Sequence, residues 1–119
     1  MANVRSMLVH RAMELVKRDL RRAWTVDDLA DELGVSRATL CRAFAAQGLP
    51  PPIETLTAER MHEAARRLRV SDASLAEIAD AVGYRSEFAL SRAFKRAMGL
   101  APMHYRRAFA GVARTRMAA

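Results

Sequence analysis

The stretches TLCRAFAAQGL, from Thr39 to Leu49, and ALSRAFKRAMGL, from Ala89 to Leu100, repeat the pattern L-x-R-A-F about fifty residues apart. The similarity extends upstream, where DLADELGVS (28–36) matches EIADAVGYRS (77–86), except for one extra residue in the turn of the second copy. Each copy has the pattern of a short amphipathic helix, a glycine suited to a positive φ, and a second helix that stops at another glycine. The chain therefore contains two copies of a helix-turn-helix.

The rest of the sequence predicts an all-α protein built around this repeat. The chain has 119 residues, of which 51% are hydrophobic and 6% aromatic, and it is sparse in β-branched residues. Periodicity and capping residues predict seven helices, at 6–19, 26–33, 37–47, 52–69, 75–82, 87–98 and 102–107, followed by a frayed tail, GVARTRMAA (111–119). Of the two capping boxes, Thr25–Asp28 and Ser74–Glu77, we expect the second to be the better formed.

The predicted helices form one domain over 1–119 with two helix-turn-helix subdomains, at 6–49 and 72–109. A linker helix over 51–69 follows the proline run. From Pro52 to Arg69 it would be about 27 Å long, which suits two recognition helices placed about one DNA turn apart. Trp24 is expected to fill the seam between the first helix and the first subdomain. We expect no sensor domain in a chain of this length, and both a stand-alone regulator and the C-terminal part of a longer one remain open.

The charge balance points to a polyanionic partner. Twenty Lys and Arg residues face thirteen Asp and Glu residues, giving a formal net charge of +7 and a pI near 10.9. A basic excess dominated by arginine in a small helical domain is typical of nucleic-acid binding. The single cysteine excludes an internal disulfide and suits a reducing, cytoplasmic compartment. We expect neither a secretory signal in this sequence nor a membrane-spanning segment, since no apolar run is long enough to span a bilayer.

The second helix of each copy presents a matched outer face. If Leu40 and Phe44 point inward, the opposite face carries Ala38, Cys41, Arg42 and Ala45. The same rotation in the second copy exposes Phe88, Ser91, Arg92 and Lys95. Arginine occupies the centre of both faces, and its planar donor fork can read a guanine in the major groove.

These motifs resemble the DNA-binding domain of the AraC/XylS family of bacterial transcription regulators. The most specific part is IADAVGYRSEFALSRAFKRAMGLAPMHYRR, from Ile78 to Arg107, which is similar to the family signature I-A-x-x-x-G-[YF] … S-x-x-x-F-x-R-x-F-K-x-x-x-G-x-x-P-x-x-Y-R. Leu90 replaces a phenylalanine of that signature, and Thr55 stands where the family often has an aromatic residue. The resemblance implies a homeodomain-like fold of two helix-turn-helix subdomains joined by a long helix. It also implies that the chain reads two adjacent major grooves of double-stranded DNA as a monomer and regulates transcription, with RNA polymerase as a candidate partner.

Transferred position by position, the resemblance implies two sets of site residues. The base-reading candidates are Ala38, Cys41, Arg42, Glu87, Phe88, Ser91 and Arg92. The phosphate-contacting candidates are Ser36, Arg37, Arg85, Ser86, Lys95, Arg96 and Arg106. Ala38 and Cys41 are poor hydrogen-bonding groups, so we expect the first recognition helix to depend on Arg42 and on DNA shape.

Several residues have more than one interpretation. Cys41 fits either a redox switch or a small apolar contact with the DNA, and Phe88 fits either a thymine methyl contact or packing on a neighbouring helix end. The arginines at 66, 67 and 69 fit a solvated face better than a phosphate contact. The three histidines lack metal-ligand spacing and no catalytic set is present, so we expect no metal, no cofactor, no small-molecule site and no enzyme activity. The alternative function is a helical protein–protein adaptor that uses its basic face.

Overall fold

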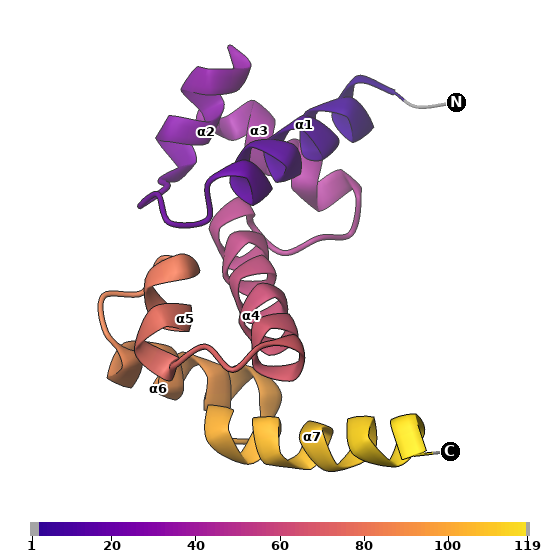
Figure 1. Ribbon diagram of the computed structural model, residues 1–119. Coiled ribbons are helices and arrows are strands. Elements are labelled where there is room, and N and C mark those ends of the chain that lie inside the picture. Colours follow the sequence, from indigo (N-terminus) through magenta and orange to yellow (C-terminus); the bar gives the residue numbers. More distant parts are fainter. Residues whose placement is uncertain (1–2, 119) are drawn as a thin grey trace. The chain divides into compact units, whose positions relative to one another are not determined.

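The computed structural model describes residues 3–118, with side chains described over 3–110, and this part of the chain is helical without any strand (Figure 1). It contains seven helices, which are α1 (Val4–Arg18), α2 (Val26–Leu33), α3 (Arg37–Ala46), α4 (Pro52–Val70), α5 (Leu75–Ala81), α6 (Glu87–Met98) and α7 (Pro102–Ala118). The predicted all-α class is therefore confirmed.

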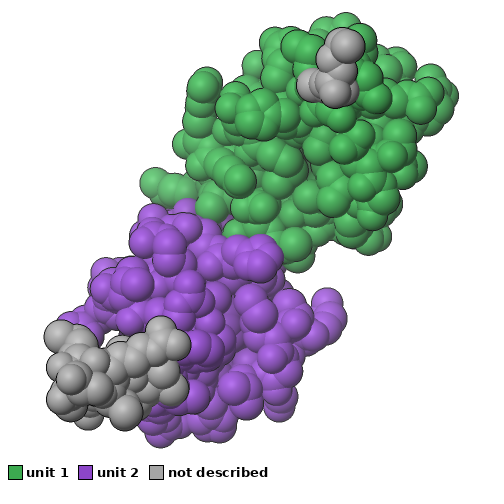
Figure 2. Space-filling model, turned by 90° about the vertical axis from the view of Figure 1, so that its right-hand side faces the viewer, with its two compact units in different colours: residues 1–59 green, residues 60–119 purple. Residues whose placement is uncertain are grey.

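The contacts within the chain divide it into two compact units, residues 1–59 and 60–119 (Figure 2). The boundary falls inside α4, so this helix contributes residues to both units. The first unit contains α1, α2, α3 and the start of α4, and the second contains the remainder of α4 with α5, α6 and α7.

The core of the first unit closes around Trp24. Its ring is 8% exposed, and its Nε1 donates a hydrogen bond to the carbonyl of Asp19 at 2.9 Å. The Arg22 guanidinium lies over the ring, 3.9 Å from its centroid. Apolar side chains from four helices complete the cluster, which contains Ala12, Val16, Leu29, Ala30, Leu40, Phe44 and Leu56. Trp24 therefore fills the seam between α1 and the helix-turn-helix, as predicted.

The core of the second unit is centred on Phe94 of α6. Phe94 is completely buried and meets the ring of Tyr105 edge-on, with the centroids 5.3 Å apart. The apolar faces of α4 and α5 surround it, with Met61, Ala64, Ala65, Leu68, Ile78, Ala79, Val82 and Leu90 in the same cluster. The inward pairs Leu40/Phe44 and Leu90/Phe94 are all at most 1% exposed, which confirms the predicted orientation of both second helices.

Of the two predicted capping boxes, the first is the better formed, which is the opposite of our expectation. The Asp28 N–H donates to the Thr25 hydroxyl and the Thr25 N–H donates to the Asp28 carboxylate, both at 3.0 Å, so this box is complete. The backbone hydrogen bond from Thr25 is the main reason that the pKa of Asp28 lies below its ordinary value. At Ser74 the hydroxyl oxygen accepts a hydrogen bond from the Glu77 N–H. The Glu77 carboxylate accepts from the Ser74 hydroxyl at 3.2 Å and not from the Ser74 backbone N–H, so this box is incomplete. The prediction that the second box is the better formed is therefore wrong.

Two helix ends differ from the prediction by more than one residue. The first helix begins at Val4 rather than Ser6, because the Asn3 side chain caps it by accepting from the Ser6 N–H at 2.8 Å. The last helix continues to Ala118 rather than ending at Arg107, so the predicted frayed tail is helical over 111–118, while Ala119 lies outside the described residues. A single glycine inside a helix costs only about 1 kcal/mol relative to alanine, and Gly111 is followed largely by good helix formers.

We predict that Phe94→Ala lowers the free energy of unfolding by about 3–5 kcal/mol, because it removes a buried aromatic ring. Chemical denaturation measures this loss. Phe88→Ala is the matched control, because Phe88 lies on the same helix and is 68% exposed. An unfolding midpoint unchanged by Phe94→Ala would contradict the place of Phe94 in the core.

We predict that Asp28→Asn reduces stability near neutral pH and that the difference from the wild type fades on acidification. A carboxylate whose pKa is lower in the folded state stabilises above its unfolded pKa, and this contribution disappears as the pH falls through the folded pKa. Thermal melts at a series of pH values measure the effect. A difference from the wild type that stays constant over the pH series would contradict the role of the charged box.

Candidate nucleic-acid interface

The two units build the turn before their second helix in the same way. Gly34 and Gly83 have φ values of 69° and 89°, a backbone conformation that residues with a Cβ atom rarely adopt. The residue after each glycine donates a hydrogen bond back across the turn, Val35 to the Ala30 carbonyl at 3.0 Å and Tyr84 to the Ala79 carbonyl at 2.8 Å. This bond closes the end of the first helix and turns the chain sharply into the second.

The serine that follows each turn starts the second helix. Ser36 accepts a hydrogen bond from the Thr39 N–H, and Ser86 accepts one from the Ala89 N–H, both at 3.1 Å. Both serines were predicted as phosphate contacts, and in the structure their hydroxyl oxygens serve as helix caps. The backbone N–H groups of the same first turns remain suited to an anion.

In the first unit, α3 presents a small and mostly apolar outer face. Ala38 and Arg42 are exposed, and Cys41 between them is half-buried. The Arg42 guanidinium makes a long hydrogen bond of 3.5 Å to the Thr39 hydroxyl, so it lies along its own helix. Ala38 and Arg42 therefore lie opposite the buried Leu40 and Phe44, and the half-buried Cys41 lies at the edge of this face.

In the second unit, α6 presents a larger face that combines an aromatic ring with charge. Phe88 is 68% exposed and Arg92 is exposed, while Glu87 and Ser91 are half-buried. The exposure of Phe88 argues against the interpretation that its ring packs on a neighbouring helix end. The arginines at 42 and 92 occupy equivalent positions in the repeat, so each unit presents one guanidinium from the middle of its second helix.

The exposed cationic phosphate candidates fall into two groups. Arg85, Lys95 and Arg96 are exposed around α6. Arg37 makes a paired contact with Asp27, at 3.0 and 3.2 Å, in which both side chains are more than 60% exposed. An exposed ion pair of this kind contributes little stability, so a phosphate can replace the carboxylate.

Arg106 has a structural role that the sequence did not reveal. Its Nε donates to the carbonyl of Leu68 and its terminal nitrogen donates to the carbonyl of Ser71, both at 3.0 Å. These bonds cap the C-terminal end of α4, where carbonyl groups lack helical partners. The donor and its acceptors are far apart in sequence, so only the fold brings them together.

Three arginines near the C-terminal end of α4 also have partners inside the second unit. Glu63 accepts from both Arg66 and Arg67, and these hydrogen bonds hold the pKa of its carboxyl below the ordinary value. Arg69 donates to the Tyr105 hydroxyl at 2.6 Å and lies 5.9 Å from the centroid of the Phe109 ring. These contacts favour the solvated-face interpretation over a phosphate contact.

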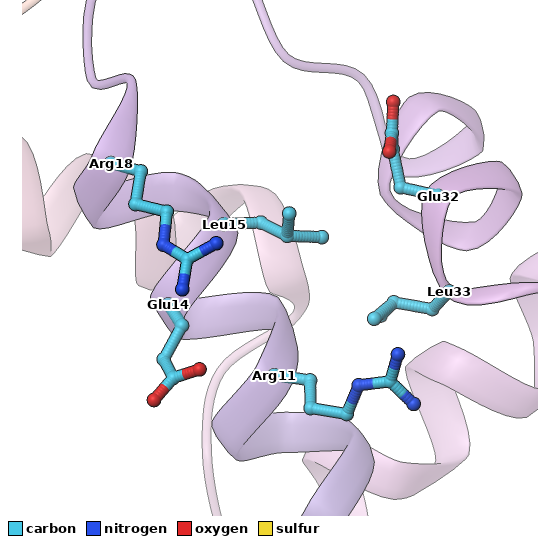
Figure 3. A pocket seen from close by; sticks show the side chains of 6 residues that line it. All are labelled: Arg11, Glu14, Leu15, Arg18, Glu32 and Leu33. Carbon is cyan, nitrogen blue, oxygen red and sulfur yellow. The ribbon is translucent and has the colours of Figure 1, made fainter.

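A shallow groove of about 240 Å³ lies between α1 and α2, away from the second helix of the repeat. Figure 3 shows Leu15 and Leu33 pointing toward one another across it, and its other lining residues are Arg11, Glu14, Arg18 and Glu32. None of these charged side chains is buried, so the groove lacks the enclosed polar group of a typical ligand site.

The described part of the chain has neither a cluster of metal-ligating side chains nor a membrane-spanning helix. No group of three or more His, Cys, Asp or Glu side chains there could hold a metal ion. None of the helices among these residues is long and apolar enough to cross a bilayer.

Comparisons with known proteins agree with this geometry. A family model described as "Helix-turn-helix domain" matches residues 29–108. An AraC-like transcription regulator of Streptomyces lividans is 48% identical over 90% of this chain, and a similar protein of Streptomyces antibioticus is 44% identical over the same share. In both cases the chain spans 35% of the length of its relative.

Two solved structures share both the fold and part of the sequence. The C-terminal domain of AraT, a response regulator from Geobacillus stearothermophilus, has a TM-score of 0.81 and 34% identity, over 89% of this chain and 88% of that one. The DNA-binding domain of AdpA, solved in complex with a target DNA, has a TM-score of 0.75 and 32% identity, over 91% and 94% of the two chains. With the family model matching most of its length, the chain belongs to the AraC/XylS family of transcription regulators and has the helix-turn-helix fold of their DNA-binding domain.

Proposed function

We propose that the chain is the sequence-specific, double-stranded-DNA-binding part of a bacterial transcription regulator. The main supporting observation is the equivalence of Arg42 and Arg92, each exposed in the middle of a second helix whose opposite side is buried. Helices α3 and α6 would each enter a segment of the major groove, and each arginine would donate two hydrogen bonds to O6 and N7 of a guanine.

The charge of the chain supports DNA as the ligand. Its formal net charge is +7, and exposed cations flank α6 at Arg85, Lys95 and Arg96. Phosphate contacts by these side chains would position the protein without carrying sequence information, and they would make binding depend strongly on salt. The related AdpA domain was solved in complex with a target DNA, which also supports DNA as the ligand of this chain.

The cellular setting follows from the family. The relatives are bacterial transcription regulators rather than enzymes, so we infer that the chain acts on DNA in the bacterial cytoplasm. RNA polymerase is the corresponding candidate partner, and one copy of this chain would suffice to occupy both major-groove segments.

Selection of bound duplexes from a random pool tests the proposal directly. A sequence-specific reader should enrich a defined site, and its affinity for that site should fall steeply as salt increases. A protein–protein adaptor with a basic face would also show salt-dependent retention of DNA, but without a base preference. Failure to enrich any sequence would therefore favour the adaptor.

We predict that Arg42→Ala and Arg92→Ala each weaken binding to the selected site by about 1–3 kcal/mol and relax the preference at one base position. Titration of labelled duplexes that vary at each position measures both effects. Arg5→Ala, which removes an exposed arginine on α1, is the control for the loss of one charge. Wild-type base preference in both variants would show that the assignment of the reading faces is wrong.

We predict that the selected site consists of two dissimilar boxes with centres about 10 base pairs apart, rather than a palindrome. The two reading faces belong to one chain and differ, with Ala38 and Cys41 in α3 where α6 has Phe88 and Ser91. Inserting about five base pairs, half a helical turn, should reduce the affinity towards that of a single box. A palindromic site occupied by two chains, or full tolerance of the insertion, would contradict this arrangement.

A further inference from the structure

Phe88 has an unusual environment for a phenylalanine. It lies in the first turn of α6, it is 68% exposed, and it precedes the reading arginine Arg92 by one helical turn. The other phenylalanines with described exposure are better covered, from fully buried Phe94 to Phe109 at 39%. Residues four apart lie on the same side of a helix, so the exposed ring belongs to the same face as Arg92 and would meet whatever occupies that face.

We propose that Phe88 is a specificity-determining residue that recognises the C5-methyl group of a thymine in the DNA box bound by α6. This inference depends on the proposed DNA-binding function and adds to it the identity of one base. A phenyl ring can neither donate nor accept a conventional hydrogen bond, so it cannot read the polar edges of the bases. The thymine methyl is the apolar group that the major groove offers to such a side chain.

The helix geometry sets the position of this thymine relative to the guanine read by Arg92. Residues four apart lie on the same side of a helix, and a rise of about 1.5 Å per residue separates them by about 6 Å along its axis. Successive bases of one strand are about 3.4 Å apart. We therefore place the thymine about two base pairs from the guanine.

The first unit provides an internal comparison. The equivalent position there is Ala38, which also precedes its arginine by one turn and is exposed. A single methyl group covers far less of a thymine methyl than a phenyl ring does. The box bound by α3 should therefore depend less on thymine methyl groups than the box bound by α6.

The experiment compares matched base pairs that differ only by the methyl group. Once selection has defined the site, each thymine of the α6 box is replaced in turn by deoxyuridine, which lacks the methyl and keeps the pairing with adenine. At the sensitive position, 5-methylcytosine is then compared with cytosine. The wild-type protein should bind each methylated base about fourfold more tightly than its unmethylated counterpart, the effect of burying one methyl-sized group.

Variants assign this effect to Phe88. Phe88→Ala should remove the methyl preference and weaken binding to the thymine site by about tenfold or more, whereas Phe88→Leu should keep most of the preference. Met103→Ala, which truncates an exposed apolar residue of α7, should leave the preference unchanged. The melting temperature of Phe88→Ala should stay close to that of the wild type because the ring is exposed.

The possible results separate this inference from the proposed function. If a defined site is selected but thymine and deoxyuridine bind equally throughout the α6 box, the methyl contact is refuted and DNA binding stands. If Phe88→Ala binds normally and keeps the methyl preference, another residue reads the methyl, and the exposed ring would instead mark a protein-docking position. If no site is selected, both the proposed function and this inference fail.

Discussion

The burial of two residues one turn apart on each second helix determines the rest of the interface. Leu40 and Phe44 in α3, and Leu90 and Phe94 in α6, are at most 1% exposed. Because an α-helix advances by about 100° per residue, fixing this pair inward also fixes which residues face outward. The glycine turn and the serine cap support this constraint by starting the helix at the right residue, so the position of each guanidinium follows from the apolar pattern beneath it.

The same constraint allows the two copies to diverge outside the core. Arg42 and Arg92 are equivalent, as are the buried residues, but their neighbours on the outer face differ, with Ala38 and Cys41 in α3 and Phe88 and Ser91 in α6. None of these four residues is fully buried, and none belongs to either core cluster. A repeated scaffold can in this way present two different surfaces over equivalent buried residues.

Periodicity and capping rules were sufficient to predict the all-α class, the seven helices, the inward residues of the repeat and the role of Trp24. They were less accurate where several local hydrogen bonds compete, as at Ser74, whose hydroxyl rather than its backbone N–H donates to the Glu77 carboxylate. The residues of the outer faces could be inferred by rotation of about 100° per residue around the helix axis. The rotation did not show which of these side chains have hydrogen-bond partners. The contacts of Arg106 with α4 join residues that only the tertiary fold brings together, so no local pattern could have indicated them.

The division of α4 between the units limits how this protein could have arisen or could be rearranged. Leu56 belongs to the first core, and Met61, further along the same helix, belongs to the second. A recombination event at either end of α4 would leave one unit without a wall of its core, even though the loops there are exposed and tolerant of insertion in other respects. The helix-turn-helix occurs twice in the sequence, but neither copy has a complete core without α4. Each copy can therefore be exchanged between proteins only together with its own segment of α4.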